Sequence, residues 1–150
     1  MKKLSYLLLI CLVWACGTSN SNTENTVSTE PVAVEPVTAD SAYVFFKNPA
    51  NGATVPSPVF IEMGVSGMEI EPAGVVKEGF GHHHILINQT SWPEGTVIPA
   101  SDSTIHFGKG QTDASIELPA GEYTIALQFA DGVHSSYGET MATSITVTVE

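Results

Sequence analysis

The chain has 150 residues, of which 43% are hydrophobic and 14% charged, and its formal net charge is −11 at pH 7. All five basic residues are lysines, and removing Lys2 and Lys3 leaves three lysines against sixteen acidic residues, a net charge of 3 − 16 = −13. Nucleic acid is not an expected partner, because phosphate binding needs a basic surface. The scattered acidic residues favour solubility over a calcium loop, which needs a dense acidic run.

The N-terminus is typical of an export signal. Lys2 and Lys3 precede a short apolar run at residues 4–13, which is too short for a membrane span. The following Ala15-Cys16 pair resembles the processing site of bacterial lipoproteins, which implies cleavage before Cys16 and acyl chains on that cysteine. We therefore expect a lipoprotein signal peptide at residues 1–15. The mature protein would be lipid-anchored in the bacterial cell envelope, at the outer membrane, facing the periplasm or the surface.

Processing would also remove all thiols from the folded part. Cys11 leaves with the signal and Cys16 carries lipid, and the chain has only these two cysteines. Disulfides and cysteine-ligated zinc are thereby excluded. Any metal would have to bind to imidazole, carboxylate or thioether groups.

The composition divides the rest of the chain into two parts. Residues 16–41 comprise the expected lipidated cysteine and a stretch rich in Ser, Thr, Asn, Glu, Pro and Val without aromatic residues, which predicts a disordered tether. Residues 42–150 are long enough to bury roughly two-thirds of their unfolded surface in a single core.

Hydrophobic residues in this second part recur with a period of two. The clearest alternation covers residues 59–65, 122–129 and 145–149, and Asn-Gly and Asp-Gly turns separate such segments. No segment is a convincing helix. We predict an all-β fold, an immunoglobulin-like antiparallel sandwich of about seven strands. The stretch "LPAGEYTI" resembles the corner of such folds, in which Tyr123 would fold back onto the backbone.

All five histidines fall in the predicted sandwich. On a strand, His82 and His84 point to one face, about 6.6 Å apart along the chain, which is a spacing at which two imidazoles can bind one ion. His83 points to the opposite face with Ile85 and Ile87, so we expect it to face the core.

The other two histidines follow strands. His106 alternates with Ile105 and Phe107 and is expected to face outward, and His134 follows a turn that contains Asp131. The hypothesis is one copper or zinc site with these candidate ligands: His82, His84, His106, His134 and Asp131. The alternatives are an exposed polar cluster for His82 and His84, and structural roles for His106 and His134.

Enzymatic activity is not expected. The Ser66 region lacks the spacing of a nucleophile elbow, and no cysteine nucleophile or Ser/His/Asp order is present. Trp92 and Tyr137 are candidates for a sugar-stacking platform, but a Trp-Pro pair in a loop favours a local packing role. We expect Met63, on the apolar side of its strand, to be packing and not a metal ligand.

Four ordered motifs resemble a known family. "GHHHILIN", "IHFGKGQT", "LPAGEYTIALQFADGVHSSYG" and "ITVTV" are similar to the exported bacterial domains called domain of unknown function 4399, over about residues 45–149. The resemblance implies a small extracytoplasmic β-sandwich, often lipid-anchored, with no established activity. It singles out these residues: Gly81 to His84, His106, Gly108, Gly110, Asp131 and His134. A fainter similarity, in "NPANGATV" and "GEYTI", is to copper-resistance sandwiches of the CopC type, which implies copper.

Two functional hypotheses follow. The first is a lipid-anchored domain that binds copper or zinc through its histidines and holds or passes the metal outside the cytoplasm. The alternative is a non-enzymatic recognition or scaffold module of the cell envelope with structural histidines, whose partner, a protein or a glycan, the sequence does not identify. A metal site made of histidines loses affinity as its imidazoles gain protons near pH 6.5, whereas partner binding by a scaffold need not.

Overall fold

Residues 42–150, which are the residues that the computed structural model describes, form nine strands and one short 3-10 helix. The expected signal peptide, the Cys16 anchor and the tether lie outside the described residues. The first strands are β1 (Tyr43–Asn48), β2 (Ala53–Val55), β3 (Val59–Ser66), β4 (Glu69–Ile70) and β5 (Phe80–Ile87). They are followed by β6 (Thr104–His106), β7 (Asp113–Ile116), β8 (Gly121–Ala130), the helix η1 (Glu139–Met141) and β9 (Ala142–Val149). No helix in the described part is long and apolar enough to cross a membrane.

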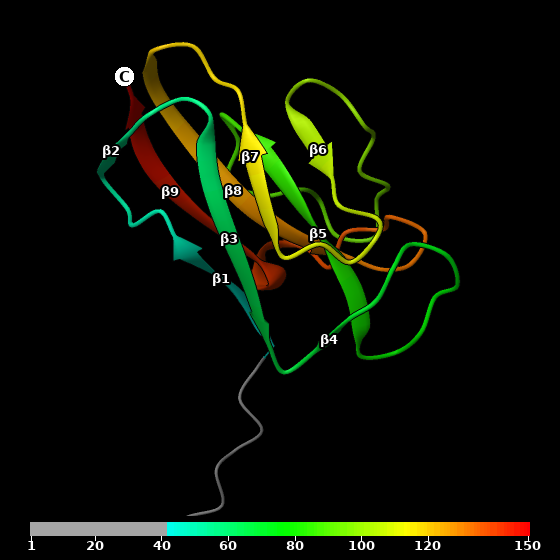
Figure 1. Cartoon of the computed structure of the whole chain (residues 1–150). Coiled ribbons are helices and arrows are strands. Elements are labelled where there is room, and N and C mark those ends of the chain that lie inside the picture. Colours follow the sequence, from blue (N-terminus) through cyan, green and yellow to red (C-terminus); the bar gives the residue numbers. More distant parts are fainter. Residues whose placement is uncertain (1–41) are drawn as a thin grey trace, which may run out of the picture. The chain divides into compact units, whose positions relative to one another are not determined.

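The strands form two sheets, as predicted for a β-sandwich. The smaller sheet has the order β1-β3-β7, and the larger has the order β2-β9-β8-β5-β4, with β6 also paired to β5 (Figure 1). Most neighbours are antiparallel, but β2 with β9 and β4 with β5 are parallel. The prediction of about seven antiparallel strands therefore missed the short parallel strands, whose two or three residues are too few to show a period.

The core lies between the two sheets and is formed by the alternating hydrophobic residues seen in the sequence. Val59, Ile61 and Met63 of β3 are fully buried, which confirms the packing role of Met63. The larger sheet contributes Ile125, Leu127 and Phe129 of β8 and alternate residues of β9 to the same cluster. Because side chains alternate across a strand, the residues between them belong to the outer face of the larger sheet.

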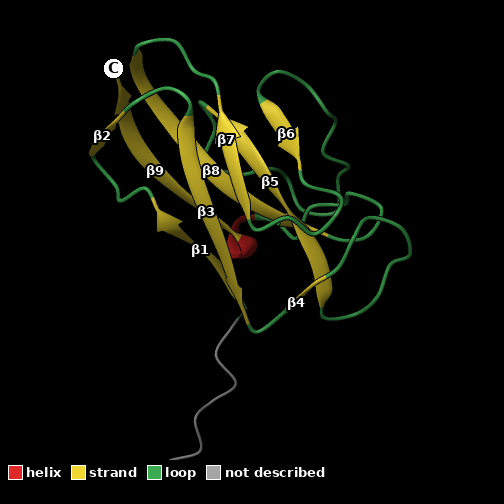
Figure 2. Cartoon of the chain, in the orientation of Figure 1, coloured by secondary structure: helices red, strands yellow, loops and turns green. Residues whose placement is uncertain are grey.

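The larger sheet is covered on both faces around β5. Seven consecutive residues of β5, from Gly81 to Ile87, are buried, and so are the last six residues of β8. On the outer face Leu86 and two alanines of β8 form a second cluster with Ile98, and Trp92 packs against it. Figure 2 shows the long loops that connect β5 to β6 and β8 to η1. These loops turn a two-layer sandwich into a structure with a third, irregular layer.

Gln128 of β8 ties this loop layer to the sheet. The buried side chain accepts a hydrogen bond from the backbone N–H of Trp92 at 2.8 Å and donates to the carbonyl oxygens of Gly138 and Met141 at 2.9 and 3.2 Å. A tyrosine hydroxyl also bonds to the backbone, as the sequence predicted, but it is that of Tyr137. It donates to the Phe80 carbonyl oxygen at 2.8 Å. Tyr123, for which this role was predicted, packs against the core.

Candidate metal centre

Two of the candidate ligands stand on β5, in the interior of the larger sheet. His82 and His84 occupy the outer face, and both are buried. Their β8 neighbours are Ala130 beside His82 and Gln128 beside His84. The small Ala130 leaves space for an imidazole ring on this face, and the overlying loops exclude water from it.

His106 reaches the same place from β6. The antiparallel register pairs His106 directly with His84, and their stacked rings have centroids 5.0 Å apart. His106 is exposed, as its alternation with the buried Phe107 predicted. Its ring lies against Gly108, at a point where any Cβ would overlap the imidazole, so this close approach requires glycine.

His134 comes from the loop after β8 and has a left-handed backbone, with φ of 68°. Asp131 supports this loop, because its Oδ1 accepts hydrogen bonds from the backbone N–H groups of Val133 and Ser135, both at 2.9 Å. The His134 N–H donates to the Asp131 carbonyl oxygen at 3.0 Å. The turn thereby directs a half-buried imidazole back toward β5.

The four imidazoles converge. Each offers one ring nitrogen, and these four atoms lie within 4.8 Å of one another. The Nε2 atom of His82 is 3.1 Å from Nε2 of His84 and 3.1 Å from Nδ1 of His134. Nitrogen ligands at the corners of a zinc tetrahedron are separated by roughly 3.3 Å, given Zn–N bonds of about 2.0–2.1 Å. The two distances from Nε2 of His82 are therefore close to those within a metal-ligand set.

Hydrogen bonding alone does not satisfy this arrangement. An imidazole nitrogen carries either one proton or one lone pair, so Nε2 of His82 can serve only one of the two ring nitrogens that face it. A cation at the centre would instead accept a lone pair from every ring. Nδ1 of His82 and Nδ1 of His84 are buried and lack a hydrogen-bond partner among the described residues, so packing orients these two rings.

The surroundings favour the neutral form of His82, His84 and His106. Burial, with the nearby His106 and His134, lowers the pKa of His82 to about 4. Burial and the neighbouring imidazoles lower the pKa of His84 to about 3, and burial with His134 also lowers the pKa of His106. Near pH 7 these rings have the free lone pairs that metal binding needs.

Not every candidate ligand joins this group. Asp131 is not among the side chains whose ligand atoms converge, and its Oδ1 supports the His134 turn. His83 faces the opposite side of β5, as predicted, and its ring packs edge-on against Phe129 with centroids 5.1 Å apart. Sequence reasoning missed Gln128 as a support of the site, and the family resemblance singled out Gly108 without giving it a structural role. The close ring contact of Gly108 and the loop anchoring by Gln128 both depend on tertiary contacts.

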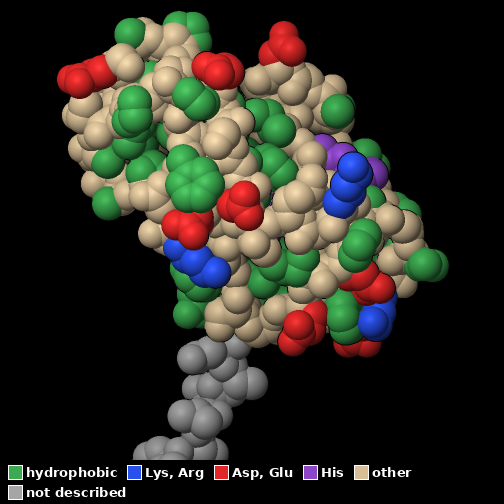
Figure 3. Space-filling view, viewed as in Figure 1, with side chains coloured by type: hydrophobic (Ala, Val, Ile, Leu, Met, Phe, Trp, Pro, Cys, Tyr) green, Lys and Arg blue, Asp and Glu red, His purple; other side chains and the backbone are tan. Residues whose placement is uncertain are grey.

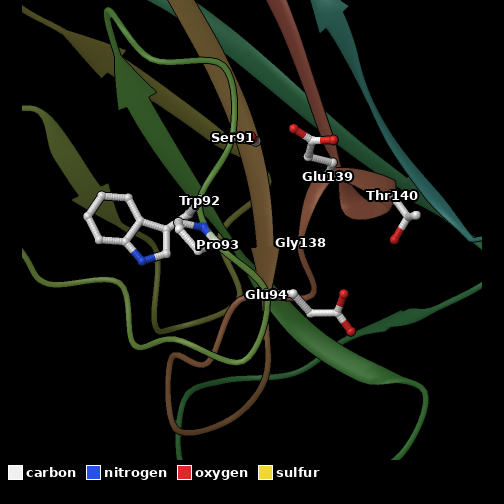
Figure 4. A pocket seen from close by; sticks show the side chains of 7 residues that line it. All are labelled: Ser91, Trp92, Pro93, Glu94, Gly138, Glu139 and Thr140. Atoms are coloured by element: carbon white, nitrogen blue, oxygen red, sulfur yellow. The ribbon is translucent and has the colours of Figure 1, made fainter.

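A surface pocket lies apart from these ligands, beside the Trp92 loop and η1. It is lined by Ser91, Trp92, Pro93, Glu94, Gly138, Glu139 and Thr140. Figure 4 shows the indole of Trp92 turned away from the two glutamates of this pocket. Because Trp92 packs against the outer-face cluster, it has the local packing role that its Trp-Pro context favoured.

A family model matches residues 61–150, and its description is domain of unknown function, DUF4399. The chain belongs to this family. The match to DUF4399 includes all four converging histidines and the strands β8 and β5 in the interior of the larger sheet. They begin after β2, so the "NPANGATV" segment lies outside the match. No curated protein and no solved structure matches the chain, and the similarity to CopC-type sandwiches stays a prediction.

Proposed function

We propose that this DUF4399 domain binds one divalent transition-metal ion, copper or zinc, through His82, His84, His106 and His134. The observation that carries the proposal is the convergence of four ring nitrogens within 4.8 Å. Imidazole is a preferred ligand of both metals, and the described part of the chain contains no thiol that would favour other chemistry. The domain would hold or pass the metal outside the cytoplasm without converting a substrate.

The N-terminal motif supports placing this activity at a membrane. The proposed lipid on Cys16 and the tether up to residue 41 would anchor the domain in the bacterial cell envelope. This location fits the metal-site chemistry, because imidazole ligands need no reducing environment, unlike free cysteines. Mass spectrometry of the protein isolated from membranes tests the anchor, with an acylated N-terminal Cys16 as the expected result and an unmodified N-terminus as the contrary one.

Thermal unfolding with and without metal tests the proposed site. The protein is produced without the signal sequence and without a polyhistidine tag, and Cu(II) or Zn(II) is added. A ligand at 100 times its dissociation constant adds about 2.7 kcal/mol to the free energy of unfolding. For a domain of this size we expect the midpoint temperature to rise by roughly 10 °C.

The three consecutive histidines provide a matched control. The double substitution His82→Ala/His84→Ala should abolish the metal-induced shift, whereas His83→Leu should leave it intact because His83 faces the core. If the domain unfolds cooperatively and neither metal changes its midpoint temperature, the result contradicts the proposal. The histidines would then be structural, and the scaffold hypothesis would take its place.

A further inference from the structure

We infer that His106 is the exchangeable ligand of this site, through which a metal ion enters and leaves, while His82, His84 and His134 retain it. This inference rests on the proposed metal site and adds a route and an order of events to it. Three properties of the four histidines carry it: their depth in the protein, the attachment of their backbones, and the packing of the His106 ring.

The four ligands differ in depth. His82 and His84 are 0% and 1% exposed, His134 is half-buried, and His106 is exposed. Figure 3 shows histidine side chains reaching the surface beside a lysine. A donor atom that approaches from solvent therefore meets the bond between the metal and His106 before the other three.

The backbone attachments follow the same order. β5, which carries the two buried ligands, pairs with β8 over six consecutive residues on one side and with β6 on the other. β6 has only three residues, and within the described part of the chain it pairs with β5 alone. Moving His82 or His84 would disrupt the sheet, whereas His106 stands on a short edge strand.

His134 is held more firmly than its loop position suggests. Its N–H donates to the Asp131 carbonyl oxygen, and its own carbonyl oxygen accepts a hydrogen bond from the Ile98 N–H, both at 3.0 Å. The Asp131 carboxylate fixes the backbone on either side of it. His134 is thus fastened both to its own turn and to the loop between β5 and β6.

The His106 ring has no such fastening. It rests on the bare backbone of Gly108, with Ala73 beside that glycine, and it also packs against the other imidazoles of the site, stacked on His84 and edge-on to His134 with centroids 4.4 Å apart. It can rotate outward without displacing a side chain of the core. As its nitrogen–metal bond breaks, an incoming nitrogen or sulfur donor forms the replacing bond. The coordination number and the oxidation state of the metal are unchanged, and His106 is left as a free neutral imidazole.

Transfer of Zn(II) to a chromophoric chelator, followed by stopped flow, tests this route. For the unsubstituted protein the transfer rate should rise with chelator concentration, because the chelator attacks the metal while three histidines still hold it. The variant His106→Ala should still bind Zn(II) and should transfer it about tenfold faster. His134→Ala, which removes a firmly held ligand, should lose at least about tenfold more affinity than His106→Ala.

The substitution Gly108→Ala tests the same point without deleting a ligand. The added methyl group would overlap the His106 imidazole and displace it, so transfer should accelerate as in His106→Ala. Lys109→Ala, next to it in the chain, is the control and should transfer at the unsubstituted rate.

Two results would overturn the inference while the proposed function survives. One is a transfer rate that does not depend on chelator concentration. The other is equal affinity and equal transfer rate for His106→Ala and His134→Ala. A failure of the unsubstituted protein to bind Zn(II) or Cu(II) at all is a separate result, which overturns the proposed function and this inference together.

Discussion

At the scale of single residues, His83 is a polar side chain buried in the apolar core. It lies between two candidate ligands but faces the apolar side of β5, and both of its ring nitrogens are buried without a hydrogen-bond partner in residues 42–150. Burial, with the charges of His82 and Lys47, lowers its pKa to about 4. A buried polar group without a partner costs about 1–3 kcal/mol in protein stability.

We expect His83→Leu to stabilise the domain. Leucine is close to histidine in volume and removes the two unsatisfied nitrogens, so the free energy of unfolding at pH 7 should rise by about 1–2 kcal/mol. Urea denaturation measures this change. A loss of stability would contradict the prediction and would mean that the His83 imidazole makes a favourable interaction in the core.

Substitutions of Asp131 can distinguish a role in supporting the His134 turn from a role as a direct metal ligand. If its Oδ1 acts by holding the His134 turn, Asp131→Asn should preserve metal affinity, because the amide oxygen accepts the same two backbone hydrogen bonds. Asp131→Ala should weaken metal binding about 10–100-fold, as is usual when an outer support of a metal ligand is lost. Isothermal titration with Zn(II) measures both variants, and equal losses in Asn and Ala would assign the carboxylate as a ligand.

At the scale of elements, one residue of β8 ties two segments of the outer layer to the sheet. Gln128 bonds the Trp92 loop and the η1 segment to the sheet from a fully buried position. We expect Gln128→Leu to lower the free energy of unfolding by about 2–4 kcal/mol, since it leaves buried backbone groups unsatisfied. Thr124→Leu, on the less buried half of the same strand, is the control and should change stability by less than about 1 kcal/mol.

The strands could be predicted from sequence wherever one face is polar. Residues 59–65 and 145–149 alternate clearly, and the period of two also placed His82 and His84 opposite His83. The alternation was misleading in β8, because Gln128 is polar in type but buried under a loop. The loop layer could not be predicted, because the sequence of residues 88–103 does not indicate which face of the sheet they cover.

The convergence of the four histidines could also not be predicted from the local sequence. His106 reaches His84 through the register of β6 on β5, and a shift of one residue would turn its ring away. His134 reaches the pair through a left-handed backbone that its residue type does not require. The motif resemblance grouped these residues without geometry, and the structure supplies the convergence of their nitrogens.

At the scale of the whole molecule, the histidines make the stability of the metal-free domain depend on pH. The pKa values of His82 and His83 are lowered to about 4 and that of His84 to about 3, whereas an unfolded chain has histidine pKa values near 6.5. Between pH 6.5 and about 4 the unfolded state therefore binds more protons than the native state. The stability contributed by these neutral rings is complete above pH 6.5 and is lost as the pH falls.

We expect the free energy of unfolding of the metal-free domain to decrease by up to about 4 kcal/mol per pH unit in this window, because three groups contribute about 1.4 kcal/mol each. Urea denaturation between pH 7.5 and 4.5 measures this slope. His83→Leu should reduce it by about one-third. Adding Zn(II) should preserve stability to a lower pH, because protons must then displace the metal before they reach the imidazoles. A stability that stays constant between pH 7.5 and 4.5 would mean that these rings gain protons in the native state as readily as in the unfolded chain, which contradicts their burial.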